Sequence, residues 1–197
     1  MIQHLMRLCL AGLLLALAVA CTSRDTAPLD LKGTDISGAD FGGSFALTAH
    51  TGKKVALSDF KGKVVALFFG YTHCPDVCPT TMLEYAGAMK KLGERARDVQ
   101  VLFVSVDPAR DTPAVLAGYV PGFDARFIGL TGSEAEVRRV AEQFKVVAQK
   151  VPAEGGGYTM DHSAGSYLFD REGQLRVYEA YGAGSANLAH DLDQLLR

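Results

Sequence analysis

Cys74 and Cys78 lie in the stretch GYTHCPDVCPTT, and each is followed by a proline. A residue that precedes proline is driven away from the helical region of backbone space. We therefore expect a tight turn between the cysteines, with Cys78 near the N-cap of a helix and Pro79 at its first position. A separation of about one helical turn places the two Cα atoms about 6 Å apart, which suits a disulfide.

This cysteine pair could serve as a structural disulfide, a redox couple or part of a metal site. A structural disulfide would add little stability here, because so short a loop constrains the unfolded chain little. At a helix N-terminus we expect a lowered thiol pKa, which favours a nucleophile or a metal ligand. Two thiolates suit Cu(I) or zinc, but a closed structural zinc site usually has four ligands and the chain has no second pair of this kind.

A third ligand would be a histidine, since imidazole binds both copper and zinc. His162 lies in YTMDHSAGSY, after three consecutive glycines and before an expected strand. His73 is adjacent to the first cysteine, so we expect its side chain to point away from the second. Met160 is a soft alternative, although a methionine before a strand is usually packing. Spacing leaves this choice open, and we interpret His50 and His190 as surface groups.

Two continuous apolar runs, KVVALFFG (63–70) and VQVLFVSV (99–106), are typical of strands buried on both faces. A helix expected over 79 to about 92 separates them, which favours an α/β sandwich with a mostly parallel central sheet flanked by helices. The cysteines then lie at the sheet edge where open α/β folds bind ligands. The other expected elements are hairpins of 45–49 with 54–58 and of 165–170 with 174–181, a strand over 127–130, and helices over 113–120, 133–144 and 185–197.

The N-terminus is typical of an export signal. A basic residue, Arg7, precedes the apolar stretch 8–20, which is too short for a membrane span. The sequence AVAC then resembles a bacterial lipobox, so we predict a signal peptide over 1–20 and lipidation of Cys21. Plain secretion, or a Cys21 without a role, are the alternatives. We expect a flexible tether over 21–40 and a single folded domain over 41–197.

Export together with lipidation predicts a protein anchored to a membrane on the periplasmic side. In that compartment paired cysteines can form a disulfide. The formal net charge is −2 and the isoelectric point is about 6.2. With no basic cluster in the chain, a nucleic-acid partner is excluded as a class.

Several stretches together resemble the Sco/SenC family of copper-binding assembly factors for cytochrome c oxidase. The resemblance runs from about Gly38 to Arg197, through DFGGSFALT, LSDFKGKVVALFFGYTHCPDVCPTT, FVSVDPARDTP, LTGS and DHSAGSYLFD. It implies a thioredoxin-like fold with a β-hairpin insertion, and copper held by Cys74, Cys78 and His162. The N-terminus differs from members anchored by a full membrane helix, which leaves the mode of attachment open.

Four carboxylates lie close in sequence to these residues. Asp76 is inside the cysteine loop and Asp161 precedes His162, so either could orient a ligand or could instead take part in a turn. Asp107 and Asp111, in VDPARDTP, could face the site or order their own loop.

Two functions remain. The first is a copper chaperone that delivers copper to the copper-A site of cytochrome c oxidase subunit II. The second is a thiol–disulfide oxidoreductase that reduces cysteines of subunit II or of another exported protein, with one cysteine attacking and the other resolving. Another periplasmic copper chaperone or thiol reductase would be a further partner. His162 discriminates between the two, because a copper site uses it and a thiol reductase does not need it.

Overall fold

The computed structural model describes residues 28–153 and 155–197. The predicted signal peptide (1–20) and the predicted lipidation site Cys21 lie outside the described residues. Within the described ranges, no helix is both long enough and apolar enough to cross a membrane.

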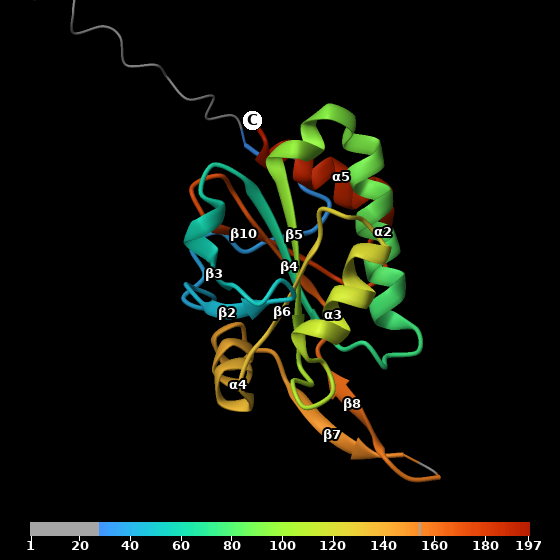
Figure 1. Ribbon diagram of the computed structural model, residues 1–197. Coiled ribbons are helices and arrows are strands. Elements are labelled where there is room, and N and C mark those ends of the chain that lie inside the picture. The colour runs from blue at the N-terminus through green and yellow to red at the C-terminus, as the bar shows by residue number, and fades with distance from the viewer. Residues whose placement is uncertain (1–27, 154) are drawn as a thin grey trace, which may run out of the picture.

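The fold is built on one eight-stranded sheet, with a separate two-stranded sheet beside it (Figure 1). The strands of the large sheet are β1 (Thr34–Asp35), β2 (Ala46–Ala49), β3 (Lys54–Ala56), β4 (Val64–Gly70), β5 (Val99–Ser105), β6 (Ile128–Thr131), β9 (Ser166–Phe169) and β10 (Leu175–Glu179), and the small sheet pairs β7 (Ala148–Pro152) with β8 (Tyr158–His162). The α-helices are α2 (Val77–Leu92), α3 (Pro113–Tyr119), α4 (Glu134–Gln143) and α5 (Gly184–Leu195), and the 3-10 helices are η2 (Leu57–Phe60), η3 (Gly93–Asp98) and η4 (Val120–Gly122).

The centre of the large sheet is parallel and both of its flanks are antiparallel. Strand β5 pairs in parallel with β4 and with β6, whereas β9 pairs antiparallel to β4 and β2 pairs antiparallel to β6. Every residue of β4 and of β5 is buried, as the apolar runs predict. The predicted α/β fold is confirmed, with a sheet that is mixed rather than wholly parallel.

Helices cover both faces of the parallel centre. Successive side chains of β4 point to opposite faces. Phe68 stacks on Tyr85 of α2 with ring centroids 5.7 Å apart, and Phe69 meets Phe144 at the end of α4 at 5.6 Å. Helix α5 lies alongside α2 (Figure 1). The sheet edge that ends β4 and β5 is thereby held between two packed layers.

The predicted helix starts at Thr112 and Ser133 are confirmed. The Thr112 side chain accepts a hydrogen bond from the Val115 N–H, and a proline follows it at the first helical position. Ser133 and Glu136 form the expected capping box. Both predicted hairpins of the large sheet also form.

The residue pattern did not predict the small sheet, and the family resemblance implied a β-hairpin insertion without giving its residues. All five residues of β7 are exposed, and β8 buries only Met160. Such a strand lacks the apolar alternation from which strands are predicted. The hairpin projects from the body of the domain at the end where β4 enters α2 (Figure 1).

The predicted tether over 21–40 is wrong for the part that the structure describes. Residues 34–35 pair with β10 as an extra strand. The backbone N–H groups of Lys32 and Gly33 donate to the Asp191 carboxylate at 2.8 to 2.9 Å. A polar segment resembles a linker in sequence, but here its backbone groups find partners on the domain.

A buried carboxyl pair lies beneath this N-terminal segment. Glu179 of β10 is 2% exposed, and Asp191 is fully buried. Burial, together with the hydrogen bond and charge of Asp191, raises the pKa of Glu179 to about 8 from its ordinary value of 4.5. Between these values the folded state binds more protons than the unfolded state. The stabilisation that the protonated carboxyl provides is therefore lost as pH rises through this window.

We expect Glu179→Gln to flatten this pH dependence, because an amide still donates to Asp191 but carries no titrating proton. The thermal unfolding midpoint of the variant should fall less between about pH 5 and pH 9 than that of the parent. Circular dichroism at both pH values measures it, with the exposed Glu94→Gln as the control. A fall in the midpoint of the variant as large as that of the parent would contradict the assignment.

Candidate metal centre

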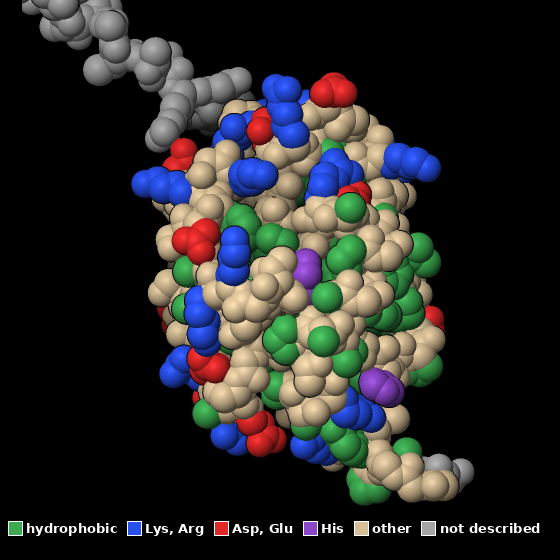
Figure 2. Space-filling model, in the orientation of Figure 1, with side chains coloured by type: hydrophobic (Ala, Val, Ile, Leu, Met, Phe, Trp, Pro, Cys, Tyr) green, Lys and Arg blue, Asp and Glu red, His purple; other side chains and the backbone are tan. Residues whose placement is uncertain are grey.

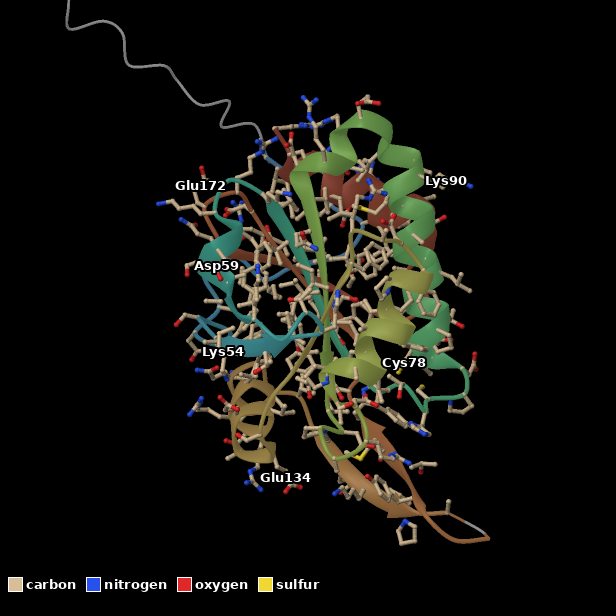
Figure 3. The ribbon with its side chains drawn as sticks, in the orientation of Figure 1. Lys54, Asp59, Cys78, Lys90, Glu134 and Glu172 are labelled. Carbon is tan, nitrogen blue, oxygen red and sulfur yellow. The ribbon has the colours of Figure 1, made fainter. Side chains whose placement is uncertain are left out.

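Two cysteines and one histidine converge at the end of β4. The ligand atoms of Cys74, Cys78 and His162 all lie within 4.8 Å of one another. Cys78 Sγ is 3.6 Å from His162 Nε2, although the two residues are 84 positions apart. Figure 3 shows Cys78 at the N-terminal end of α2, near the β7–β8 hairpin. Two thiols and an imidazole could hold a soft metal ion here.

Helix α2 begins earlier than predicted. Its N-cap is Asp76 and its first residue is Val77, so Cys78 lies within the first turn rather than near the N-cap. Pro79 is tolerated as the third residue, because the N–H groups of the first turn have no partner inside the helix. The Cys78 N–H instead donates to Cys74 Sγ at 3.3 Å. The helix start therefore points the Cys78 N–H at the first sulfur.

The predicted lowering of the thiol pKa is wrong for Cys78. Its side chain is 1% exposed, and this burial is the main cause that raises its pKa, with the hydrogen bond and charge of Cys74 adding to it. The backbone hydrogen bond from Tyr71 opposes the rise but does not cancel it. Without a metal the Cys78 thiol is protonated at neutral pH, so a bound metal ion has to displace that proton.

The His162 ring is oriented by the backbone. Its Nδ1 lies 2.9 Å from the Ser163 carbonyl oxygen. A carbonyl only accepts, so Nδ1 carries the proton and the Nε2 lone pair faces Cys78. The Tyr71 ring meets the imidazole edge to face, with centroids 5.8 Å apart. The tautomer that a metal ligand needs is already selected.

Asp76 and Asp161 lie beside the ligands in sequence but form no hydrogen bond to them within the described ranges. Asp76 accepts from the Thr80 hydroxyl at 3.3 Å. Asp161 is exposed and precedes His162 on β8, so the two side chains point to opposite faces of the strand. Their predicted role as orienting groups stays a prediction.

Asp107 and Asp111 are fully buried and bind the segments that carry the ligands. Asp111 accepts from the Thr72 N–H at 3.0 Å and from the hydroxyls of Thr72 and Ser105 at 2.6 Å each. Asp107 pairs with Arg110 and accepts a hydrogen bond from the Tyr158 hydroxyl, on the strand that ends at His162. The sequence left their role undecided, and only their side-chain partners resolve it.

The remaining candidates do not belong to the group of ligand side chains found among the described residues. His73 is exposed and contacts the Thr72 hydroxyl at 3.1 Å. His50 accepts from the Gly129 N–H at 3.0 Å, so it is a structural group rather than the free surface group that we expected. His190 contacts the Asp30 carbonyl at 2.6 Å. Met160 is 9% exposed and belongs to the core, as expected of packing.

The surface beside the centre carries apolar groups. Figure 2 shows hydrophobic side chains gathered over α2 and α3, with acidic and basic side chains interspersed elsewhere on this face. Leu83 of α2 is 62% exposed and Val115 of α3 is 40% exposed.

Gly70, the last residue of β4, permits the burial of Cys78. A Cβ at this position would lie 2.7 Å from Phe103 Cε2 and 2.9 Å from Cys78 Sγ. We expect Gly70→Ala to lower the free energy of unfolding by about 1–3 kcal/mol, the usual cost of overpacking. Denaturant unfolding measures it. Gly118→Ala, on α3 with open space around the added Cβ, is the control and should not destabilise. Equal stability of Gly70→Ala and the parent would refute this close packing.

Comparison with known proteins identifies the family of this chain. A family model described as SCO1/SenC matches residues 33–197. The chain is 38% identical over 165 residues to Protein SCO1 homolog 1, mitochondrial, of Arabidopsis thaliana, covering 83% of this chain and 47% of that protein. It therefore spans about half the length of this relative, and at most 66% of the next two curated relatives.

Solved structures of Sco proteins are also similar to this chain. The structure of Bradyrhizobium japonicum ScoI with copper bound is similar, with a TM-score of 0.73 and 44% identity over 79% of this chain and 99% of that chain. So is BsSco, described by its disulfide switch and as a member of the Sco family of cytochrome c oxidase assembly proteins, with a TM-score of 0.62 and 26% identity over 85% and 96%. Sco structures have a thioredoxin-like fold, so the predicted fold class is confirmed. The chain belongs to the SCO1/SenC family.

Proposed function

We propose that this chain binds copper through Cys74, Cys78 and His162 and delivers it to the copper-A site of cytochrome c oxidase subunit II. The observation that carries the proposal is the convergence of these three side chains within 4.8 Å. The similarity to a copper-bound ScoI supports copper as the metal. Copper is here a cargo rather than a resident cofactor.

The ligand chemistry fits a transfer protein. Two thiolates favour Cu(I), and an added imidazole makes the site acceptable to Cu(II). Three protein ligands leave a coordination position open to an incoming ligand. Cys74 and His162 are only partly buried, so a partner can approach them from solvent, whereas Cys78 is enclosed. We infer that Cys78 is the last ligand to release the ion.

A second function, thiol–disulfide oxidoreductase, is favoured by the closeness of the two sulfurs. In that reaction one thiolate attacks a disulfide of the target protein and forms a mixed disulfide. The other thiolate then displaces the target's second thiol, so the Cys74–Cys78 dithiol is oxidised to a disulfide and the target is reduced. The disulfide switch described for BsSco supports this alternative. Both reactions can occur in succession, because thiols must be reduced before they accept copper.

Copper titration of the reduced domain, in which we include residues 28–197, tests the first function. We expect one-to-one Cu(I) binding against a competing chelator, lost in Cys74→Ser and Cys78→Ser. His162→Ala should retain part of the Cu(I) affinity and almost none for Cu(II), because Cu(II) depends more on imidazole. The exposed His73→Ala is the matched control and should bind as the parent does.

Two results would count against this assignment. Equal Cu(II) binding by the parent and His162→Ala would remove His162 from the ligand set. No copper binding, together with a readily reversible Cys74–Cys78 disulfide, would favour the oxidoreductase instead.

We further propose that the protein is exported and held at a membrane by a lipid on Cys21. Another periplasmic copper chaperone or thiol reductase would then supply copper or electrons. Support comes from the AVAC sequence. The first described residues lie near the C-terminus, at the opposite end of the domain from the β7–β8 hairpin (Figure 1), so the metal centre would face away from the anchor.

We expect Cys21→Ser to move the protein from the membrane fraction to the soluble fraction after cell breakage, without changing copper binding of the domain. Mass spectrometry of the parent should find an acylated N-terminal cysteine. A parent that is already soluble and unmodified would refute lipidation.

A further inference from the structure

The β7–β8 hairpin has few ties to the body of the domain, yet its last residue is His162. Strand β7 is exposed over its whole length, and β8 buries only Met160. Lys150 reaches Glu134 of α4 at 3.7 Å, but both side chains are largely exposed. An ion pair of this kind contributes little. Something else has to hold the imidazole at the cysteine pair.

The strongest polar contacts of the hairpin are made by Tyr158, at the start of β8. Its hydroxyl donates to Asp107 Oδ1 at 2.8 Å, and its carbonyl accepts from Arg110 Nη1 at 3.0 Å. The Arg110 guanidinium lies over the Tyr158 ring, 3.9 Å from its centroid. Arg110 and Asp107 are themselves an ion pair. Charge-assisted hydrogen bonds to a fully buried carboxylate are among the stronger polar contacts in a protein.

The segment that contains Asp107 and Arg110 also contacts the cysteine loop, through Asp111. Asp111 accepts both the N–H and the hydroxyl of Thr72, two residues before Cys74. Within the segment, the Arg110 and Asp111 N–H groups donate to the Asp107 carbonyl at 3.1 and 2.9 Å, which closes a tight turn. One short turn thus contacts both halves of the metal centre.

We propose that residues 107–111, which we name the bracket segment, set the separation between the cysteine pair and the His162 imidazole. Asp111 positions the cysteine loop, while Asp107 and Arg110 position the hairpin through Tyr158. These are positioning residues, since none of them belongs to the group of metal-ligating side chains. The inference deepens the proposed function and rests on it for its copper readout.

The bracket segment has a specific consequence for the metal. When the hairpin contacts are lost, the two thiols stay in place because they lie on the cysteine loop and α2. Only the imidazole becomes less available. Since the apparent affinity falls with the fraction of molecules in the binding-competent arrangement, Cu(II) binding should weaken and Cu(I) binding should change little.

Tyr158→Phe and Arg110→Ala test the hairpin side of the bracket segment. The first removes the hydroxyl that donates to Asp107 and keeps the ring, and the second removes the ion pair and the stacked guanidinium. We expect Cu(II) affinity to fall about threefold or more in Tyr158→Phe and about tenfold or more in Arg110→Ala. Cu(I) affinity should stay within about threefold of the parent. The thiolate-to-Cu(II) absorption band should shift as the imidazole is lost.

Arg110→Lys distinguishes positioning from charge alone, because lysine keeps the charge beside Asp107 but lacks the planar fork. It should resemble Arg110→Ala in Cu(II) affinity. Thr159→Ala, at an exposed neighbouring position on β8, is the matched control and should behave as the parent does.

Hydrogen exchange of the metal-free protein gives a second, copper-independent readout. Amides of β8 should exchange faster in Arg110→Ala than in the parent, while those of β4 and α2 stay unchanged. If the parent binds no copper, the proposed function fails and hydrogen exchange alone decides on the bracket segment. Unchanged β8 exchange, Cu(II) affinity unchanged in both variants, or equal losses of Cu(I) and Cu(II) would each overturn the inference.

Discussion

The burial of the Cys78 sulfur is the constraint on which the metal centre depends. Gly70 leaves space for it at the end of β4, and the first turn of α2 carries it into the core. Burial raises the pKa of Cys78, so desolvation outweighs the favourable field of the helix N-terminus. The Cys78 sulfur therefore keeps its proton until a metal ion binds or the thiol is oxidised, which couples occupancy of the site to proton release.

The metal centre joins segments far apart in the chain, which the parallel centre of the sheet makes possible. Strands β4 and β5 end side by side, so the cysteine loop after β4 and the bracket segment after β5 meet at one edge. Asp111 of the bracket segment then binds Thr72 of the cysteine loop. The hairpin that carries His162 is long and exposed, and its attachment depends on a few strong polar contacts rather than on apolar burial.

This distribution places His162, unlike Cys78, outside the buried core. The core lies between β4, β5 and their flanking helices, and of the hairpin strands only Met160 is buried in it. The N-terminal segment is fastened at the other end, by Asp191 and by pairing with β10. Because the hairpin has so little apolar burial, the position of the imidazole depends on the polar contacts of Tyr158 rather than on core packing.

The sequence by itself determined the α/β class, the buried strands, the capped helices and the cysteine pair, because these follow from local periodicity and residue type. It left His162 undecided among the histidines until the family resemblance was considered, since sequence spacing does not report distance across a fold. Tertiary structure alone decided the raised Cys78 pKa, the β7–β8 strands and the partners of Asp107 and Asp111. It also showed residues 28–40 lying against the domain. Each of these depends on burial or on a contact between distant residues, and neither is encoded in a local pattern.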